Sequence, residues 1–388
     1  MDGVYFSMNV EINKIMTDNS VSQLGRNKYL DVVKYVLIFL VVWGHVIQQT
    51  SHLPTYPEQI DPLVRFIWTT HMPLFMGLCG YFFYKSLAKY NNAAEYRKNK
   101  LQQRMLGLFI PMLSFGFLKV LISMCEGEYD FTINNFLVYW LIQAEKIWFL
   151  GDLAINTIIM LCLWYFCNDN FSHDWKIIIL GIPLACIPKL FNISALPHMY
   201  LYFALGFCCN MMRYSYIKIF NSVKYWLIAL TIFICAYSVF SNLPWPPSEF
   251  IFTLTNHTIF NLIINDSLKI ILGISGSYLV LLIVYKVYIF FIKTDRNNKL
   301  INKIACVGKY TLDIYLLQII IVEYIFRIIN SKYFLANGID MFNFSGCFGM
   351  LMRIIITFII SIFLFEIIVK ISSYINKNAV VKKILFYR

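Results

Sequence analysis

Long apolar stretches recur along nearly the whole sequence of 388 residues, and they constrain the fold more than any other feature. A stretch of about 18 or more apolar residues is long enough to cross the hydrocarbon core of a bilayer as a helix. Only 14% of the residues are charged, against about a quarter in soluble globular chains. Because lipid offers the backbone no hydrogen-bond partners, such spans must be helical. The sequence therefore predicts an all-α fold, a polytopic transmembrane helix bundle.

About ten spans are expected, although the stretches 131–144 and 250–264 are too short or too ambiguous to count with certainty. The bundle forms one membrane domain over residues 26–376, between a polar cytoplasmic segment, 1–25, and a basic cytoplasmic tail, 377–388. Residues 1–25 contain no apolar core followed by a small-residue cleavage site, so no signal peptide is expected. The expected helices begin near Leu30, Leu63, Met105, Ile147, Lys176, His198, Tyr225, Ser267, Thr311 and Phe344.

The basic residues predict the orientation of the bundle. The net charge of +12 comes from lysines and arginines in short loops between spans, as the positive-inside rule requires of cytoplasmic loops. The segments SHLPTYPEQIDP, CEGEYDFTINN and SNLPWPPSEF contain neither lysine nor arginine and should face the outside. Both termini are then cytoplasmic, and a bacterial inner membrane fits this pattern. Because the positive-inside rule explains the charge, nucleic acid is not an expected partner.

Ionisable residues inside the first span are the strongest functional signal, because such residues are costly in a bilayer. Asp31 and Lys34 lie near the cytoplasmic end of this span, and His45 follows Lys34 after ten intervening residues. Eleven residues of helix rise about 16 Å and return to nearly the same face. One stripe thus carries a cation at its inner end and an imidazole at its outer end, which suits a reaction whose two substrates arrive from opposite sides.

A structural interpretation of the same stripe stays open. Asp31 and Lys34 can pair one turn apart at the interface, and His45 can form hydrogen bonds within the bundle. His71 in the second span favours function, since it places a second imidazole at a similar depth. A neutral imidazole can take a proton from a hydroxyl near neutral pH. Two histidines without a third ligand at suitable spacing do not predict a metal site, and the cysteines lie mostly in apolar runs and are expected to pack there.

The ordered motifs of the chain resemble the acyltransferase 3 family of membrane sugar O-acyltransferases, whose hallmark is a basic residue, ten intervening residues and a histidine. Here Lys34 and His45 carry that pattern, and the flanking YLDVVK and VVWGH are similar to the branch of fucose 4-O-acetylases. HMPLFMGLCGYFF, LQQRMLGLFIPML, IWFLGDL, YLYFALGF and VGKYTLDIYLLQ continue the resemblance from Arg26 to Gln318. Three positions depart from it: Lys34 replaces the usual arginine, Gln318 stands where many members have histidine, and Asp152 lies near rather than at the position of an acidic residue that some branches carry.

The resemblance implies transfer of an acyl group, usually acetyl from acetyl-CoA, to a hydroxyl of a surface polysaccharide or lipid-linked sugar. It assigns catalysis to His45 and His71, with Lys34 and Asp31 beside them. His45 would act either as general base or as a transient acyl carrier. The basic inner rim would receive the nucleotide end of the acyl-CoA donor through Lys34, Arg26, Lys28, Arg104 and Lys98. Acetyl-CoA is then a co-substrate, and no resident cofactor is expected.

Two other classes of protein share this composition. A polysaccharide transporter or polymerase of the cell envelope is also basic, polytopic and rich in buried charges. Transporters often contain repeated halves with broken helices, and the stripe of the first span has no counterpart in the second half of this sequence. A sensor or scaffold without chemistry would not depend on His45.

Overall fold

The computed structural model describes residues 27–50, 62–90, 92–127, 132–166, 174–190, 198–212, 216–241, 259–294, 299–334, 336 and 346–387. Within these ranges every regular element is helical, which confirms the all-α prediction. The predicted segment 1–25 and Arg26 lie outside the described residues. The elements are α2 (Lys28–Thr50), α3 (Pro62–Leu87), α4 (Ala93–Tyr96), η2 (Arg97–Leu101), α5 (Gln102–Cys125), α6 (Ile133–Glu145), α7 (Trp148–Phe166), α8 (Asp174–Leu190), α9 (His198–Met211), α10 (Tyr216–Asn221), α11 (Val223–Ser241), α12 (Ile259–Thr294), α13 (Lys299–Val307), η3 (Gly308–Tyr310), α14 (Thr311–Ile320), η4 (Ile321–Phe326), α15 (Arg327–Ile329), η5 (Asn330–Phe334), α16 (Gly346–Lys377) and α17 (Ala379–Phe386).

Five helical stretches in the described part of the chain are long and apolar enough to cross a membrane, and shorter apolar helices accompany them. The stretches are Lys28–Thr50, Ala93–Cys125, Trp148–Phe166, Ser267–Ile292 and Phe348–Lys377. The helix α6, within the stretch judged too short for a span, has 13 residues. The second ambiguous stretch lies partly outside the described residues, and its last part begins α12. The helices form a membrane bundle, and the number of ten spans stays a prediction.

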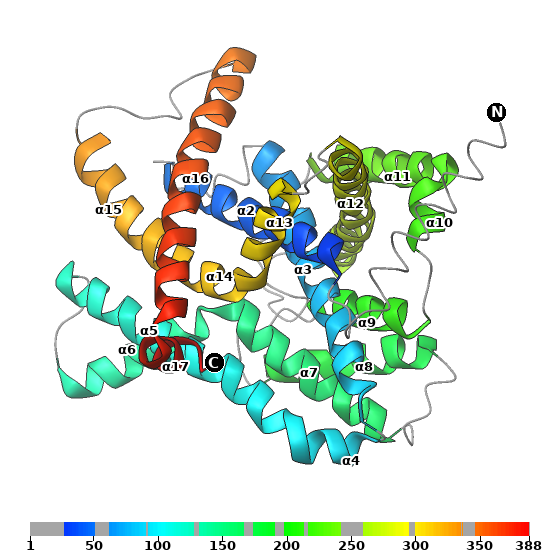
Figure 1. The fold of residues 1–388 in the computed structure, drawn as a ribbon, viewed down its shortest axis with the longest axis horizontal. Helices are drawn as coiled ribbons and strands as arrows, with labels where there is room; N and C mark the ends of the chain where they lie inside the picture. The colour runs from blue at the N-terminus through cyan, green and yellow to red at the C-terminus, as the bar shows by residue number, and fades with distance from the viewer. Residues whose placement is uncertain are drawn as a thin grey trace.

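The first span, α2, occupies the interior of the bundle (Figure 1). It packs against α3, α12, α13, α14 and α16. In its most apolar window 61% of the residues are buried, whereas the corresponding window of α16 is only 28% buried. Phe348, Ile359 and Phe363 of α16 are more than half exposed, as expected of side chains that face lipid. Asp31 of α2 is therefore enclosed by protein, and the side chains of Lys34 and His45 are each only 19% exposed.

Glycines allow α3 and α9 to cross at very short range. A Cβ atom added at Gly80 would collide with the carbonyl group of Phe203, and one added at Gly206 would collide with the carbonyl group of Gly77. Small residues let helix backbones approach closely in membranes, where packing replaces the hydrophobic driving force. This crossing fixes the position of α3, which carries His71.

Gly206→Val should destabilise the protein by at least about 2 kcal/mol, because the new side chain meets backbone that cannot move aside. Thermal unfolding of the detergent-solubilised protein checks this expectation. Gly151→Ala is the matched control, since its Cβ would lie 3.8 Å from the Met112 side chain, an ordinary contact. Equal melting temperatures for the two variants would show that the α3–α9 crossing is looser than described.

Candidate functional site

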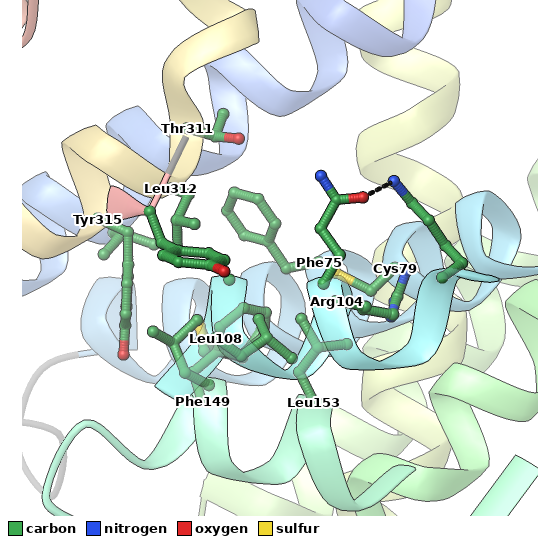
Figure 2. Close-up of a pocket in the computed structure, with 16 residues that line it drawn as sticks. Phe75, Cys79, Arg104, Leu108, Phe149, Leu153, Thr311, Leu312 and Tyr315 are labelled. Atoms are coloured by element: carbon green, nitrogen blue, oxygen red, sulfur yellow. Dashed lines mark hydrogen bonds between the residues drawn. The ribbon is translucent and has the colours of Figure 1, made fainter. Parts of the chain in front are cut away.

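A cavity of about 390 Å³ lies between α2, α3, α5, α7 and α14. Figure 2 shows side chains from these helices converging on it, including Phe75, Leu108, Phe149 and Leu312. Most of the lining is apolar, and the polar groups gather where α5 begins. The lining residues are Val41, Met72, Phe75, Cys79, Lys100, Gln103, Arg104, Gly107, Leu108, Phe149, Leu150, Leu153, Thr311, Leu312, Tyr315 and Tyr387.

One end of the cavity is basic. The Lys100 ammonium donates a hydrogen bond of 2.6 Å to the side-chain oxygen of Gln103, drawn as a dashed line in Figure 2. The Arg104 guanidinium lies 4.7 Å from the centre of the Phe83 ring, and its Nε donates to the Thr157 hydroxyl at 3.4 Å. Contact with an aromatic face holds a cation in place without neutralising it. This end of the cavity can therefore bind an anionic group.

The predicted donor-binding residues do not all reach the cavity. Arg104 lines it, whereas the exposed Lys28 and Lys98 are not among its lining residues. Lys34 forms an ion pair of 2.7 Å with Asp31, and its ammonium lies 5.2 Å from the centre of the Phe82 ring. The structure thus contains the Asp31–Lys34 pair that the structural interpretation of the stripe expected.

Sequence spacing could have identified Lys100 in place of Lys98. Gln103 and Arg104 lie three and four residues after Lys100, and Gly107 lies four and three residues after them, so the four share one helical face. Lys98 is six residues from Arg104, a separation that turns it well away from that face. The cavity is lined by the face of η2 and α5 that carries Lys100 and Arg104.

The apolar end of the cavity approaches the two histidines. Val41 lines the cavity and lies one helical turn before His45 on α2, and Met72 lines it next to His71 on α3. Neither histidine is among the lining residues, so the cavity that holds Lys100 and Arg104 reaches the neighbours of His45 and His71 rather than the imidazoles themselves. A long ligand with an anionic head can place its other end near His45.

The structure brings His45 and His71 to one side chain, Trp68. The ring centres of His45 and Trp68 are 5.8 Å apart, and those of Trp68 and His71 are 6.1 Å apart. His71 is buried, and its Nδ1 contacts the carbonyl oxygen of Ile67 in its own helix. That contact requires a proton on Nδ1, which leaves Nε2 of His71 as an acceptor. The two imidazoles, which were expected at a similar depth, thus both lie next to the indole ring of Trp68.

A carboxylate that the sequence analysis did not assign faces His45. Oε1 of Glu323 lies 3.6 Å from Nδ1 of His45, slightly beyond hydrogen-bonding distance. Gln318, fully buried, donates from Nε2 to the same oxygen at 3.5 Å. The residue that departs from the family pattern is thus a neighbour of this carboxylate.

A π-helical segment explains why α-helical spacing does not predict the contact between Gln318 and Glu323. Glu323 lies in η4, and π-helical turns are frequent at functional sites. In an α-helix, residues five apart would point about 140° from each other, but the wider π-turn brings Gln318 and Glu323 together. Arg327, which has α-helical spacing from Glu323, forms an ion pair of 2.9 Å with Glu126. The sequence signal that could have identified Glu323 is the cost of an ionisable residue in a membrane helix.

The arrangement of His45 and Glu323 is suited to proton transfer. A carboxylate beside one imidazole nitrogen orients the ring and stabilises its protonated form. With a proton on Nδ1 toward Glu323, Nε2 of His45 can accept a proton from a hydroxyl group. Contacts of this kind are often long without substrate and shorten when it binds. Among the described residues, no group of three His, Cys, Asp or Glu side chains is arranged to hold a metal ion.

Comparison with known proteins gives the family. A family model described as an acyltransferase domain matches residues 27–369 of this chain. The chain is 27% identical over 192 residues to nodulation protein NolL of Sinorhizobium fredii, and 28% identical over 191 residues to nodulation protein NolL of Mesorhizobium japonicum. Each alignment covers 47% of this chain and 48% of the relative, so the chain spans about half the length of the curated relatives it matches. No solved structure matches the chain significantly. The family match covers most of the chain, including both histidines and all the cavity-lining residues except Tyr387, and the protein is an integral membrane member of this acyltransferase family.

Proposed function

We propose that the protein is a membrane-bound O-acyltransferase that moves an acetyl or similar acyl group from acetyl-CoA to a hydroxyl of a surface polysaccharide or lipid-linked sugar. The observation that carries the proposal is a cavity lined by Lys100 and Arg104 and also by Val41, which lies one helical turn from the His45 that faces Glu323. An acyl-CoA has the matching form, with phosphates at one end and a thioester at the end of a long arm.

The donor is proposed to enter from the cytoplasm. Arg104 and Lys100 would hold its phosphates, since charge-assisted hydrogen bonds to phosphate are strong. The volume of about 390 Å³ is typical of small-molecule sites and suits the arm and the thioester. Lys34 would add positive charge nearby, because its field and that of Arg104 both act on the Cys79 thiol in the cavity wall.

The acceptor is proposed to approach His45 from the other side of the membrane. In the first route, Nε2 of His45 removes the proton from the sugar hydroxyl while its oxygen attacks the thioester carbonyl carbon. The carbon–sulfur bond then breaks, the imidazolium returns the proton to the departing thiolate, and the products are an ester and coenzyme A. In the second route, His45 carries the acyl group transiently. His71 would assist through Trp68, which both imidazoles contact.

The orientation rests on the basic loops. By the positive-inside rule, the Arg104 end, the chain termini and the loops rich in lysine would face the cytoplasm, in a membrane proposed to be a bacterial inner membrane. This places the basic end of the cavity where acetyl-CoA is found. The glycan acceptor and the surrounding lipid would be its other partners.

Mass spectrometry of the cell-surface glycan tests the function directly. A strain with the intact gene should carry base-labile acyl esters, and a deletion strain should lack them while making glycan of the same length and amount. Complementation with the intact gene should restore the esters. Unchanged ester content together with an altered amount or length of glycan would favour the transporter or polymerase interpretation.

Occupancy of the cavity by the donor predicts protection of Cys79. This residue is the cysteine among the described lining residues, so coenzyme A should slow its reaction with a small thiol reagent severalfold. Cys306, exposed on α13, should react at the same rate with and without coenzyme A. Peptide mass spectrometry of the labelled protein measures both sites. Equal labelling of Cys79 under both conditions would place the donor elsewhere.

A further inference from the structure

Lys119 is a buried cation in the middle of the bundle, and the proposed reaction leaves it without a role. It is 4% exposed and lies on α5. Placing an ammonium group inside a membrane protein is costly, so such residues are commonly functional. The positive-inside rule does not explain Lys119, because it lies 15 residues after Arg104, about 22 Å farther along the helix than the basic end.

The surroundings of Lys119 lead to the active-site carboxylate. Its ammonium lies 5.8 Å from the centre of the ring of Tyr324, the residue that follows Glu323. Glu323 is the carboxylate whose charge acts on Lys119, while Lys146 and Arg327 act on it as like charges. Arg327 has a carboxylate partner of its own in Glu126. Lys119 therefore lies beside the segment that carries Glu323, as a charge of opposite sign, and the two side chains form no direct ion pair.

We propose, on the basis of the proposed acyl transfer, that Lys119 is a positioning residue that acts through Glu323 on His45. The Glu323 side chain is only 25% exposed, and a carboxylate partly withdrawn from water is stabilised by a nearby cation and by hydrogen bonds. Lys119 supplies the cation, and Gln318 supplies a hydrogen bond of 3.5 Å. Together they keep the Glu323 carboxylate aimed at Nδ1 of His45, so that Nε2 stays available to the acceptor hydroxyl. Lys119 itself need not touch either substrate.

Replacement of Lys119 tests this role in membrane vesicles that carry out transfer from acetyl-CoA to the native glycan. Lys119→Met should lower kcat by about tenfold to hundredfold, as loss of a supporting partner commonly does, with KM for acetyl-CoA unchanged. Lys119→Gln should behave similarly, and Lys119→Arg should restore most of the rate because it keeps the charge. Lys286→Met is the matched control, since Lys286 is an exposed lysine on α12 that also lies near an aromatic ring.

A double-mutant cycle with Glu323→Gln separates positioning from direct contact with substrate. If Lys119 acts through Glu323, Lys119→Met should change the rate by less than about twofold in the Glu323→Gln background, because interdependent residues are not additive. A further large loss in that background would overturn the proposal in favour of direct contact with a substrate. Full activity of soundly folded Lys119→Met or Lys119→Gln would also overturn it. Absence of transfer by the unmodified protein would instead refute the proposed function.

Discussion

His45→Ala should lower the rate of acyl transfer by about a thousandfold or more, within the range expected when a general base is removed. The proton of the acceptor hydroxyl would lose its acceptor, and an acyl group would lose its carrier, so both proposed routes fail. The variant should still fold, because the His45 side chain is only partly buried and alanine favours helices. Initial rates of label transfer from acetyl-CoA to glycan in membrane vesicles, divided by the amount of protein, measure the effect.

His198→Gln is the control for this experiment. His198 also lies in an apolar helix, α9, where its ring packs against Tyr202 at 6.4 Å, and its replacement should leave the rate nearly unchanged. Glu323→Gln should have an intermediate effect of about tenfold to hundredfold, because it weakens the orientation of His45 without removing the imidazole. Activity of His45→Ala equal to that of His198→Gln would mean that His45 is structural.

Gly107→Leu should block the donor cavity. Gly107 lines the cavity, and a Cβ added to it meets no protein atom within 4 Å, so a larger side chain would occupy the space proposed for the donor. Steric conflict of about 1–3 kcal/mol corresponds to about a tenfold to hundredfold loss of kcat/KM for acetyl-CoA. Protection of Cys79 by coenzyme A should weaken in parallel. Titration of acetyl-CoA in vesicles provides the kinetic constants.

The stability of the Gly107 variant should not fall, which distinguishes a blocked site from a damaged fold. Leucine has a higher helix propensity than glycine, and no neighbour of Gly107 has to move. Phe109→Leu, a change two residues away at a largely exposed position of α5, should leave the donor affinity as it is. A Gly107→Leu protein with normal kinetics would exclude this cavity as the donor site.

The helical class and the interior position of the first span were predictable from the sequence. Apolar length specifies helices in a membrane, and the ionisable residues of α2 required protein around them. The exact extent of the helices was harder to predict. The apolar span Ser267–Ile292 forms only part of the 36-residue α12, because Asn261, Asn265 and Asp266 interrupt the apolar residues at the start of that helix.

The candidate site was predictable where regular helical geometry holds. The spacing from Lys34 to His45 placed the imidazole deep in the bundle, and Arg104 does line the cavity. The contact between Gln318 and Glu323 was not predicted, because a π-helical segment changes which side chains share a face. The proximity of Lys119 to Glu323 could not be predicted, because α5 and η4 are about 200 residues apart in the chain. Only tertiary packing brings these segments together.

Labelled acetyl-CoA supplied to sealed inside-out vesicles from cells that make the native glycan tests the central claim most directly. In such vesicles the cytoplasmic face is accessible, and vesicles with the unmodified protein should transfer label into base-labile esters of the glycan. Right-side-out vesicles and His45→Ala vesicles should not. Equal incorporation with and without His45, or incorporation from right-side-out vesicles alone, would contradict a passage that receives acyl-CoA from the cytoplasm and delivers its acyl group at His45.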